Sequence, residues 1–177
     1  DINRVLQLVP GVTLYEEDGF GLRPNISLRG TSPQRSSKIT LMEDGVLIAP
    51  APYSAPSAYY FPSIARMEAV EILKGSSQIQ YGPFTTGGAI NMVSTSIPDS
   101  LKIGLRSHYG SFSTGQVYAS VGQSSERIGY LVEYQNNKSN GFKELNEENT
   151  GFDSSDFMGK LRYSSSKQAA VPQYVEL

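Results

Sequence analysis

The 177-residue sequence contains no cysteine and a single histidine, His108. Without cysteine the chain forms no disulfides, no thiolate metal sites and no cysteine nucleophile. One histidine argues against a zinc site, which draws on several such ligands, and against a Ser-His-Asp triad. We therefore expect no resident metal or cofactor and no catalysis by a cysteine nucleophile or a Ser-His-Asp triad.

The sequence also lacks a marked excess of charge and any long apolar run. Lys and Arg number 15 against 17 for Asp and Glu, so the formal net charge is -2. This balance lacks the excess of basic residues that is typical of nucleic-acid-binding proteins, so we exclude nucleic acid as a partner. No window approaches the ~18 uninterrupted apolar residues of a membrane helix. Membrane barrels carry a weaker signal of alternating ~10-residue segments, so a membrane location stays open.

Glycine and aromatic residues are frequent, with 17 Gly, 11 Tyr and 7 Phe, which is typical of β-rich chains. The chain begins at Asp1 and ends at Leu177 within an apolar-looking run, so we expect a fragment or a processed product. The side-chain periodicity changes near Pro98. This change predicts two parts, residues 1–97 and residues 98–177.

Residues 1–97 have the mixed pattern of an α+β domain with a small mixed sheet and short helices. The first residues can form a short helix that Pro10-Gly11 ends. Asp44-Gly45 favours a tight hairpin, because both turn residues tolerate positive φ. Four prolines in residues 49–62 predict a stiff loop outside any central strand. We expect strands over 25–29, 39–42, 46–48, 68–74 and 88–95, and a surface loop over 75–87.

Residues 98–177 alternate strictly between apolar and polar side chains, which predicts strands with one apolar face and one polar face in contact with water. Leu131 is the exception to this rule. The links at 111–115 and 123–127 are short, whereas 138–155 is long, polar and net acidic. A soluble sandwich and a membrane barrel both fit this pattern. The strands are expected over 101–109, 117–121, 128–135 and 156–163.

Residues 1–97 carry short motifs in a fixed order. They read VPGV at 9–12, ISLRG at 26–30, LMEDGV at 41–46, MEAVEILKG at 67–75 and QYGPFTTGGAINMV at 80–93. Each motif is weak alone, but together and in this order they resemble the plug domain of a TonB-dependent outer-membrane receptor. Within that family, the segments FGLRPN, PQRSS and APAPY most resemble the receptors for ferric citrate.

The resemblance implies an architecture. Residues 1–97 would be a plug domain that lacks its N-terminal part. Residues 98–177 would be the first strands of a transmembrane β-barrel of about 22 strands, roughly four strands and the start of a fifth. The acidic segment 138–155 would then lie outside the cell and the link 123–127 in the periplasm.

Barrel membership also predicts which side chains face lipid, because charge on the lipid face costs ~2–4 kcal/mol at the bilayer midplane. Residues on the apolar side should face lipid: Leu101, Ile103, Leu105, Val117, Val132 and Leu161. Those on the wet side should face the plug or the lumen: Lys102, Arg106, Glu133, Lys160 and Arg162.

The resemblance further implies a ligand site on the outer loops of the plug. A ferric citrate complex is anionic and rich in carboxylate and hydroxyl oxygens, which suits an arginine beside hydroxyl donors. The expected ligand-binding residues are Arg35, Ser36, Ser37, Tyr53, Ser54 and Ser57. Plug–barrel contacts are expected at Arg29 and Lys74. The family's second motif usually has arginine where Lys74 stands, and lysine lacks the planar fork, so Arg29 is the stronger candidate.

The function implied is the uptake of a ferric chelate, most closely ferric citrate, across the outer membrane of a Gram-negative bacterium. The partners would be outer-membrane lipid and a TonB-type energy-coupling complex in the periplasm. Two alternatives stay open. The same architecture could import another siderophore, cobalamin, haem or an oligosaccharide, or the chain could be a soluble β-rich binding module.

Overall fold

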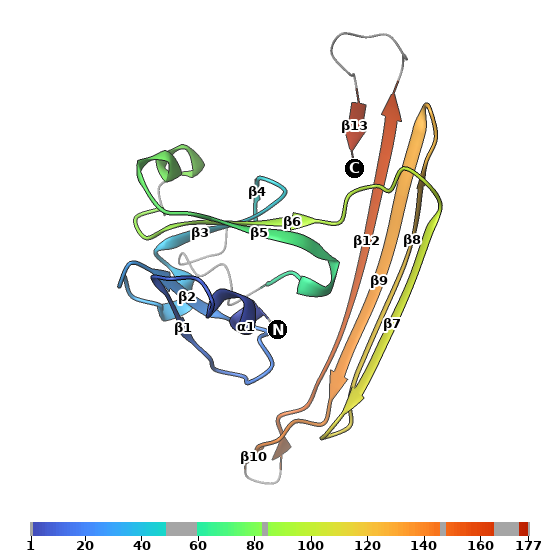
Figure 1. Cartoon of the computed structure of the whole chain (residues 1–177). Coiled ribbons are helices and arrows are strands. Elements are labelled where there is room, and N and C mark those ends of the chain that lie inside the picture. The colour runs from blue at the N-terminus through green and yellow to red at the C-terminus, as the bar shows by residue number, and fades with distance from the viewer. Residues whose placement is uncertain (1, 49–59, 83–84, 146–147, 165–173, 177) are drawn as a thin grey trace. The chain divides into compact units, whose positions relative to one another are not determined.

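The computed structural model describes residues 2–48, 60–82, 85–145, 148–164 and 174–176. The chain forms two compact units, Asp1–Thr95 and Ser96–Leu177 (Figure 1). Within the described ranges, no helix is long and apolar enough to cross a membrane.

The first unit is a small mixed sheet with short helices, as predicted. Its helices are α1 (Ile2–Leu6) and the 3-10 helices η1 (Gln34–Ser36), η4 (Ile64–Arg66) and η5 (Ser76–Tyr81). Its strands are β1 (Val12–Tyr15), β2 (Asn25–Leu28), β3 (Ile39–Glu43), β4 (Val46–Leu47), β5 (Met67–Leu73) and β6 (Gly88–Ser94).

The strands of this unit form two sheets. The hairpin of β1 and β2 is antiparallel, and α1 lies beside it (Figure 1). The four-stranded sheet has the order β4-β3-β6-β5, in which β3 and β6 are parallel and the other pairs antiparallel. The predicted hairpin turn is confirmed, with φ of 49° at Asp44 and 79° at Gly45.

Two local elements differ from the sequence expectation. Strand β1 was not expected, because four residues directly after a helix end are too few to show a period. Residues 76–81, expected as surface loop, form the 3-10 helix η5. The backbone N–H of Gly75 donates to Gln78 Oε1 (3.3 Å), which closes the first turn of η5.

The core of the first unit is built from apolar side chains of α1, of strands β2, β3 and β6, and of Ile48, which follows β4. The buried members are Ile2, Leu6, Ile26, Leu28, Ile39, Leu41, Ile48, Ile90 and Met92. Packing around Gly88 is closest: a Cβ added there would lie 2.3 Å from Leu28 Cδ1 and 2.8 Å from Leu73 O. Only glycine fits this position, where φ is also +146°.

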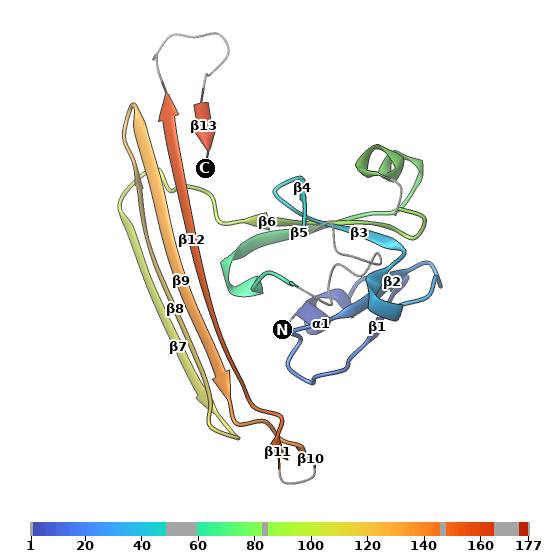
Figure 2. The same cartoon turned by 180° about the vertical axis from the view of Figure 1, so that it is seen from behind.

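The second unit is a sheet of long antiparallel strands in the order β13-β12-β9-β8-β7, seen from behind in Figure 2. Four consecutive strands and the start of a fifth agree with the predicted barrel strands. Their bounds are β7 (Lys102–Gly110), β8 (Thr114–Ser124), β9 (Ile128–Ser139), β12 (Phe152–Ser164) and β13 (Tyr174–Glu176).

The register separates the side chains into two faces, as the alternation predicted. Ile103 pairs with Val121, which pairs with Val132, whereas Lys102 pairs with Gly122 on the other face. The apolar face is widely exposed, with Leu105 at 75%. A soluble sandwich would bury that face. On this face the strands expose the large apolar side chains of Ile103, Leu105, Tyr109, Val117, Ile128, Tyr130, Val132, Tyr134, Phe157, Leu161 and Tyr163.

The exceptional Leu131 lies on the polar face and is only 3% exposed. It pairs with Gly122, where an added Cβ would lie 3.0 Å from Leu131 Cδ1. A glycine opposite therefore leaves the space that this leucine fills.

The connections between consecutive strands differ in length. Three residues, 111–113, join β7 to β8, and 125–127 join β8 to β9. The connection from β9 to β12 spans 140–151, shorter than the expected 138–155 because both strands extend into it. It contains a small hairpin of β10 (Glu144–Leu145) and β11 (Glu148–Asn149).

The two faces of β7 can be tested with fluorophores on the adjacent positions 105 and 106, which have nearly the same depth. In the full-length protein reconstituted into lipid bilayers, a label on Leu105→Cys should be strongly quenched by brominated lipids. A label on Arg106→Cys should be quenched weakly, because its side chain leaves the opposite face. Equal quenching at both positions would contradict a lipid-facing apolar side.

Gly88→Ala should destabilise the first unit by about 1–3 kcal/mol, because the new methyl group overlaps Leu28 and the Leu73 carbonyl. Amide hydrogen exchange of β2 and β6 would measure this as a lower local opening free energy. Gly159→Ala is the control, since nothing lies within 4 Å of a Cβ there. Similar exchange in the two variants would refute the packing argument.

Candidate functional site

The loop before β3 brings Arg35 back to the start of β2. The backbone N–H of Arg35 donates to Asn25 Oδ1 (2.7 Å), and Asn25 is only 4% exposed. Arg35 and Ser36 have φ of 52° and 53°, which side chains other than glycine rarely adopt. Such strain persists where the surroundings hold it, and it concentrates at binding sites. The side chain of Arg35 is exposed and available to a ligand.

The predicted hydroxyl donors are placed differently from one another. Ser36 is fully buried, donates to Pro24 O (3.0 Å) and accepts from the backbone N–H of Ile26 (2.9 Å). Its hydroxyl is thus committed to the backbone and positions the loop. Ser37 is half-buried beside it. Three predicted residues lie outside the described part of the chain: Tyr53, Ser54 and Ser57.

The two cations expected at plug–barrel contacts meet at one turn. The backbone N–H of Arg29 donates to Gly11 O (2.9 Å), and Lys74 Nζ donates to Pro10 O. The side chain of Arg29 is exposed, and its φ is 56°. Among the described residues no carboxylate forms an ion pair with either cation. The backbone of Arg29 and the side chain of Lys74 thus contact the same turn, at Pro10-Gly11.

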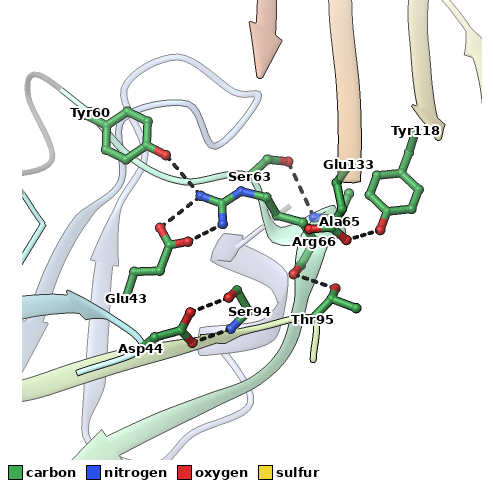
Figure 3. A network of polar contacts seen from close by, with 10 residues as sticks. All are labelled: Glu43, Asp44, Tyr60, Ser63, Ala65, Arg66, Ser94, Thr95, Tyr118 and Glu133. Atoms are coloured by element: carbon green, nitrogen blue, oxygen red, sulfur yellow. Dashed lines mark hydrogen bonds and ion pairs between the residues drawn. The ribbon is translucent and has the colours of Figure 1, made fainter. Parts of the chain in front are cut away.

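A buried ion pair that the sequence did not reveal lies between β3 and η4. Arg66 pairs with Glu43 through both nitrogens, with Nη2 2.9 Å from Oε2, and Nη2 also donates to Tyr60 Oη at 3.0 Å (Figure 3). The side chains of Arg66 and Glu43 are 6% and 20% exposed. Burial alone would lower the pKa of Arg66, but the hydrogen bonds and charges of Glu43 and Tyr60 outweigh it and raise that pKa.

The neighbouring hairpin turn is fixed to β6 by further polar contacts. Asp44 accepts from the backbone N–H of Ser94 (2.8 Å) and from its hydroxyl (Figure 3). The N–H of Gly45 donates to Asn91 Oδ1 (2.9 Å), and Asn91 Nδ2 donates to Glu71 Oε2 (2.9 Å). These carboxylates thus hold strands together.

The polar face of the second unit carries its own contacts. Tyr118 Oη donates to Glu133 Oε1, and the guanidinium carbon of Arg106 lies 4.3 Å from the centre of the Tyr118 ring. Arg162 Nη2 donates to Ser124 Oγ (2.7 Å). In the ranges that the structure describes, no three His, Cys, Asp or Glu residues could together hold a metal ion.

Comparison with known proteins identifies relatives of both units. The family described as TonB-dependent Receptor Plug Domain matches residues 1–89. The vitamin B12 transporter BtuB of Vibrio vulnificus is 29% identical over 166 residues, which cover 90% of this chain and 26% of that protein.

Solved structures share the fold at lower identity. The siderophore receptor PirA from Acinetobacter baumannii superposes with a TM-score of 0.68 at 20% identity, covering 95% of this chain and 27% of that one. The pyoverdine outer-membrane receptor FpvA of Pseudomonas aeruginosa gives 0.73 at 18% identity, covering 99% and 24%. This chain therefore spans about a quarter of the length of these relatives.

Replacing Arg66 by Met should lower the local opening free energy of β3 and β6 by about 3 kcal/mol, because Glu43 would keep a buried charge without its partner. Amide hydrogen exchange would measure the change. Adding Glu43→Gln should recover most of the loss, since the uncompensated charge is then removed. Arg4→Met, at an exposed position of α1, is the control. If the double variant were no more stable than Arg66→Met, the pair would not be coupled.

Proposed function

The chain belongs to the TonB-dependent receptor plug domain family, and on that premise we propose that it is the first part of an outer-membrane receptor for a ferric chelate. The receptor would lie in the outer membrane of a Gram-negative bacterium. It would catalyse no reaction itself. A TonB-type complex in the periplasm would supply the energy by acting on the plug after the cargo has bound.

The single observation that carries this proposal is the succession of the two units. A plug-type domain, matched over residues 1–89, is followed by strands whose apolar face is exposed. In a closed barrel that face would meet lipid, and the polar face would meet the plug and lumen. We assign residues 1–97 to the plug and 98–177 to the first strands of a barrel of about 22 strands.

The finer proposal is that the cargo is ferric citrate, and it rests on Arg35. Its guanidinium is exposed on a loop whose strained backbone is held by Asn25 and Ser36. A planar, permanently charged donor suits the carboxylates of a citrate complex. The relative BtuB is named as a vitamin B12 transporter. Cobalamin is therefore the second candidate, followed by other siderophores.

Arg35→Ala in the receptor should weaken ferric citrate binding by at least about tenfold, because charge-assisted hydrogen bonds contribute ~1.5–3 kcal/mol each. Arg35→Lys should recover only part of the affinity, since a point charge cannot reproduce the planar fork. Arg4→Ala, which removes an exposed arginine from α1, is the matched control. Titration calorimetry with ferric citrate would measure all four proteins.

Tyr53→Ala should also weaken binding if the proline-rich loop contributes to the site, because prolines keep a loop pre-ordered and limit its entropy cost. Unchanged affinity in both the Arg35→Ala and Tyr53→Ala variants would contradict the citrate proposal. Tight binding of cyanocobalamin in place of ferric citrate would favour the second candidate.

A further inference from the structure

The loop between β1 and β2 closes around the carboxylate of Asp18. Asp18 Oδ1 accepts from the backbone N–H groups of Phe20 (2.7 Å), Gly21 (2.7 Å) and Leu22 (3.3 Å). The other oxygen, Oδ2, accepts from the N–H of Arg23 at 2.8 Å. Four successive N–H donors therefore converge on one carboxylate, which fixes the course of the backbone from residue 18 to residue 23.

The local sequence makes this arrangement possible. Gly19 and Gly21 have φ of 72° and 75°, a conformation that side chains rarely adopt. Alternation of right-handed and left-handed residues turns successive N–H groups toward one side and forms an anion-binding concavity. In this chain Asp18 fills the concavity from within. The loop is thereby ordered without a bound ligand.

The same loop lies against the loop that carries Arg35. Directly after Arg23, Pro24 O accepts the hydroxyl of Ser36 at 3.0 Å. One residue further, Asn25 Oδ1 accepts the backbone N–H of Arg35 at 2.7 Å. The two loops are thus joined at consecutive residues. The side chains of Arg23 and Arg35 are both exposed there.

We propose that Asp18 is a positioning residue for anionic cargo, which orders the 18–23 loop so that Arg23 binds the same ligand as Arg35. This inference rests on the proposed function and adds a second guanidinium to its site. Two guanidinium groups on joined, pre-ordered loops match a cargo that carries several carboxylates. Ordering the loop before the ligand arrives reduces the conformational entropy lost on binding.

The test is a double-mutant cycle on ferric citrate affinity in the full receptor. Asp18→Ala should weaken binding about three- to tenfold, because the loop must then be ordered on binding. In the Arg23→Ala background the same change should have little further effect, since Asp18 acts through Arg23. Glu17→Ala is the matched control, because it removes the same charge from an exposed neighbouring residue. Asp18→Asn, which keeps one acceptor oxygen, should restore part of the affinity.

The possible results separate this inference from the proposed function. If the wild-type receptor binds ferric citrate and the Asp18→Ala and Glu17→Ala variants bind it with equal affinity, the inference is overturned. The proposed function would then still stand. The inference would also be overturned if the losses of affinity from Asp18→Ala and Arg23→Ala were additive in the double variant and Asp18→Ala lowered the thermal midpoint. Asp18 would then only stabilise the fold. A wild-type receptor that binds no ferric citrate would reject the cargo proposal, and this inference with it.

Discussion

The hydrogen-bonded register of β7, β8, β9 and β12 is the constraint on which the second unit depends. Because side chains alternate along each strand, the register gathers the apolar residues on one face and the charges on the other. A shift of one residue in any strand would reverse its faces and place charges such as Arg106 or Lys160 among exposed apolar side chains. The length and regularity of these strands follow from that requirement.

The first unit depends on a different kind of interaction. Its apolar core is small, and polar contacts complete it: Arg66 with Glu43, and Asp44 with Ser94. These contacts join segments far apart in the sequence, so they fix the end of β3 and the hairpin turn to η4 and β6. The loop that carries Arg35 is ordered in the same manner, through buried Asn25 and Ser36. Such pre-ordering would suit the proposed receptor, because little conformational entropy would be lost on cargo binding.

The strands and their faces could be predicted because alternation is a local signal, readable along each strand. The hairpin at Asp44-Gly45 could be predicted because its signal is also local: both turn residues tolerate positive φ. The Arg66–Glu43 pair could not, since its members are 23 residues apart and neither stands out locally. Among the candidate site residues, Arg35 is exposed, and its ligand-binding role stays a prediction. The burial of Ser36 could not be foreseen, because it arises when the loop folds back onto β2.

The most direct test of the account is uptake of radiolabelled iron from ferric citrate by Gram-negative cells whose own ferric citrate receptor has been deleted. The full-length receptor that contains this chain should restore uptake, and uptake should cease when the TonB-type complex is absent or the proton gradient is collapsed. Uptake that persists without energy coupling would contradict the account. So would a receptor that reaches the outer membrane and takes up only a neutral cargo such as cyanocobalamin.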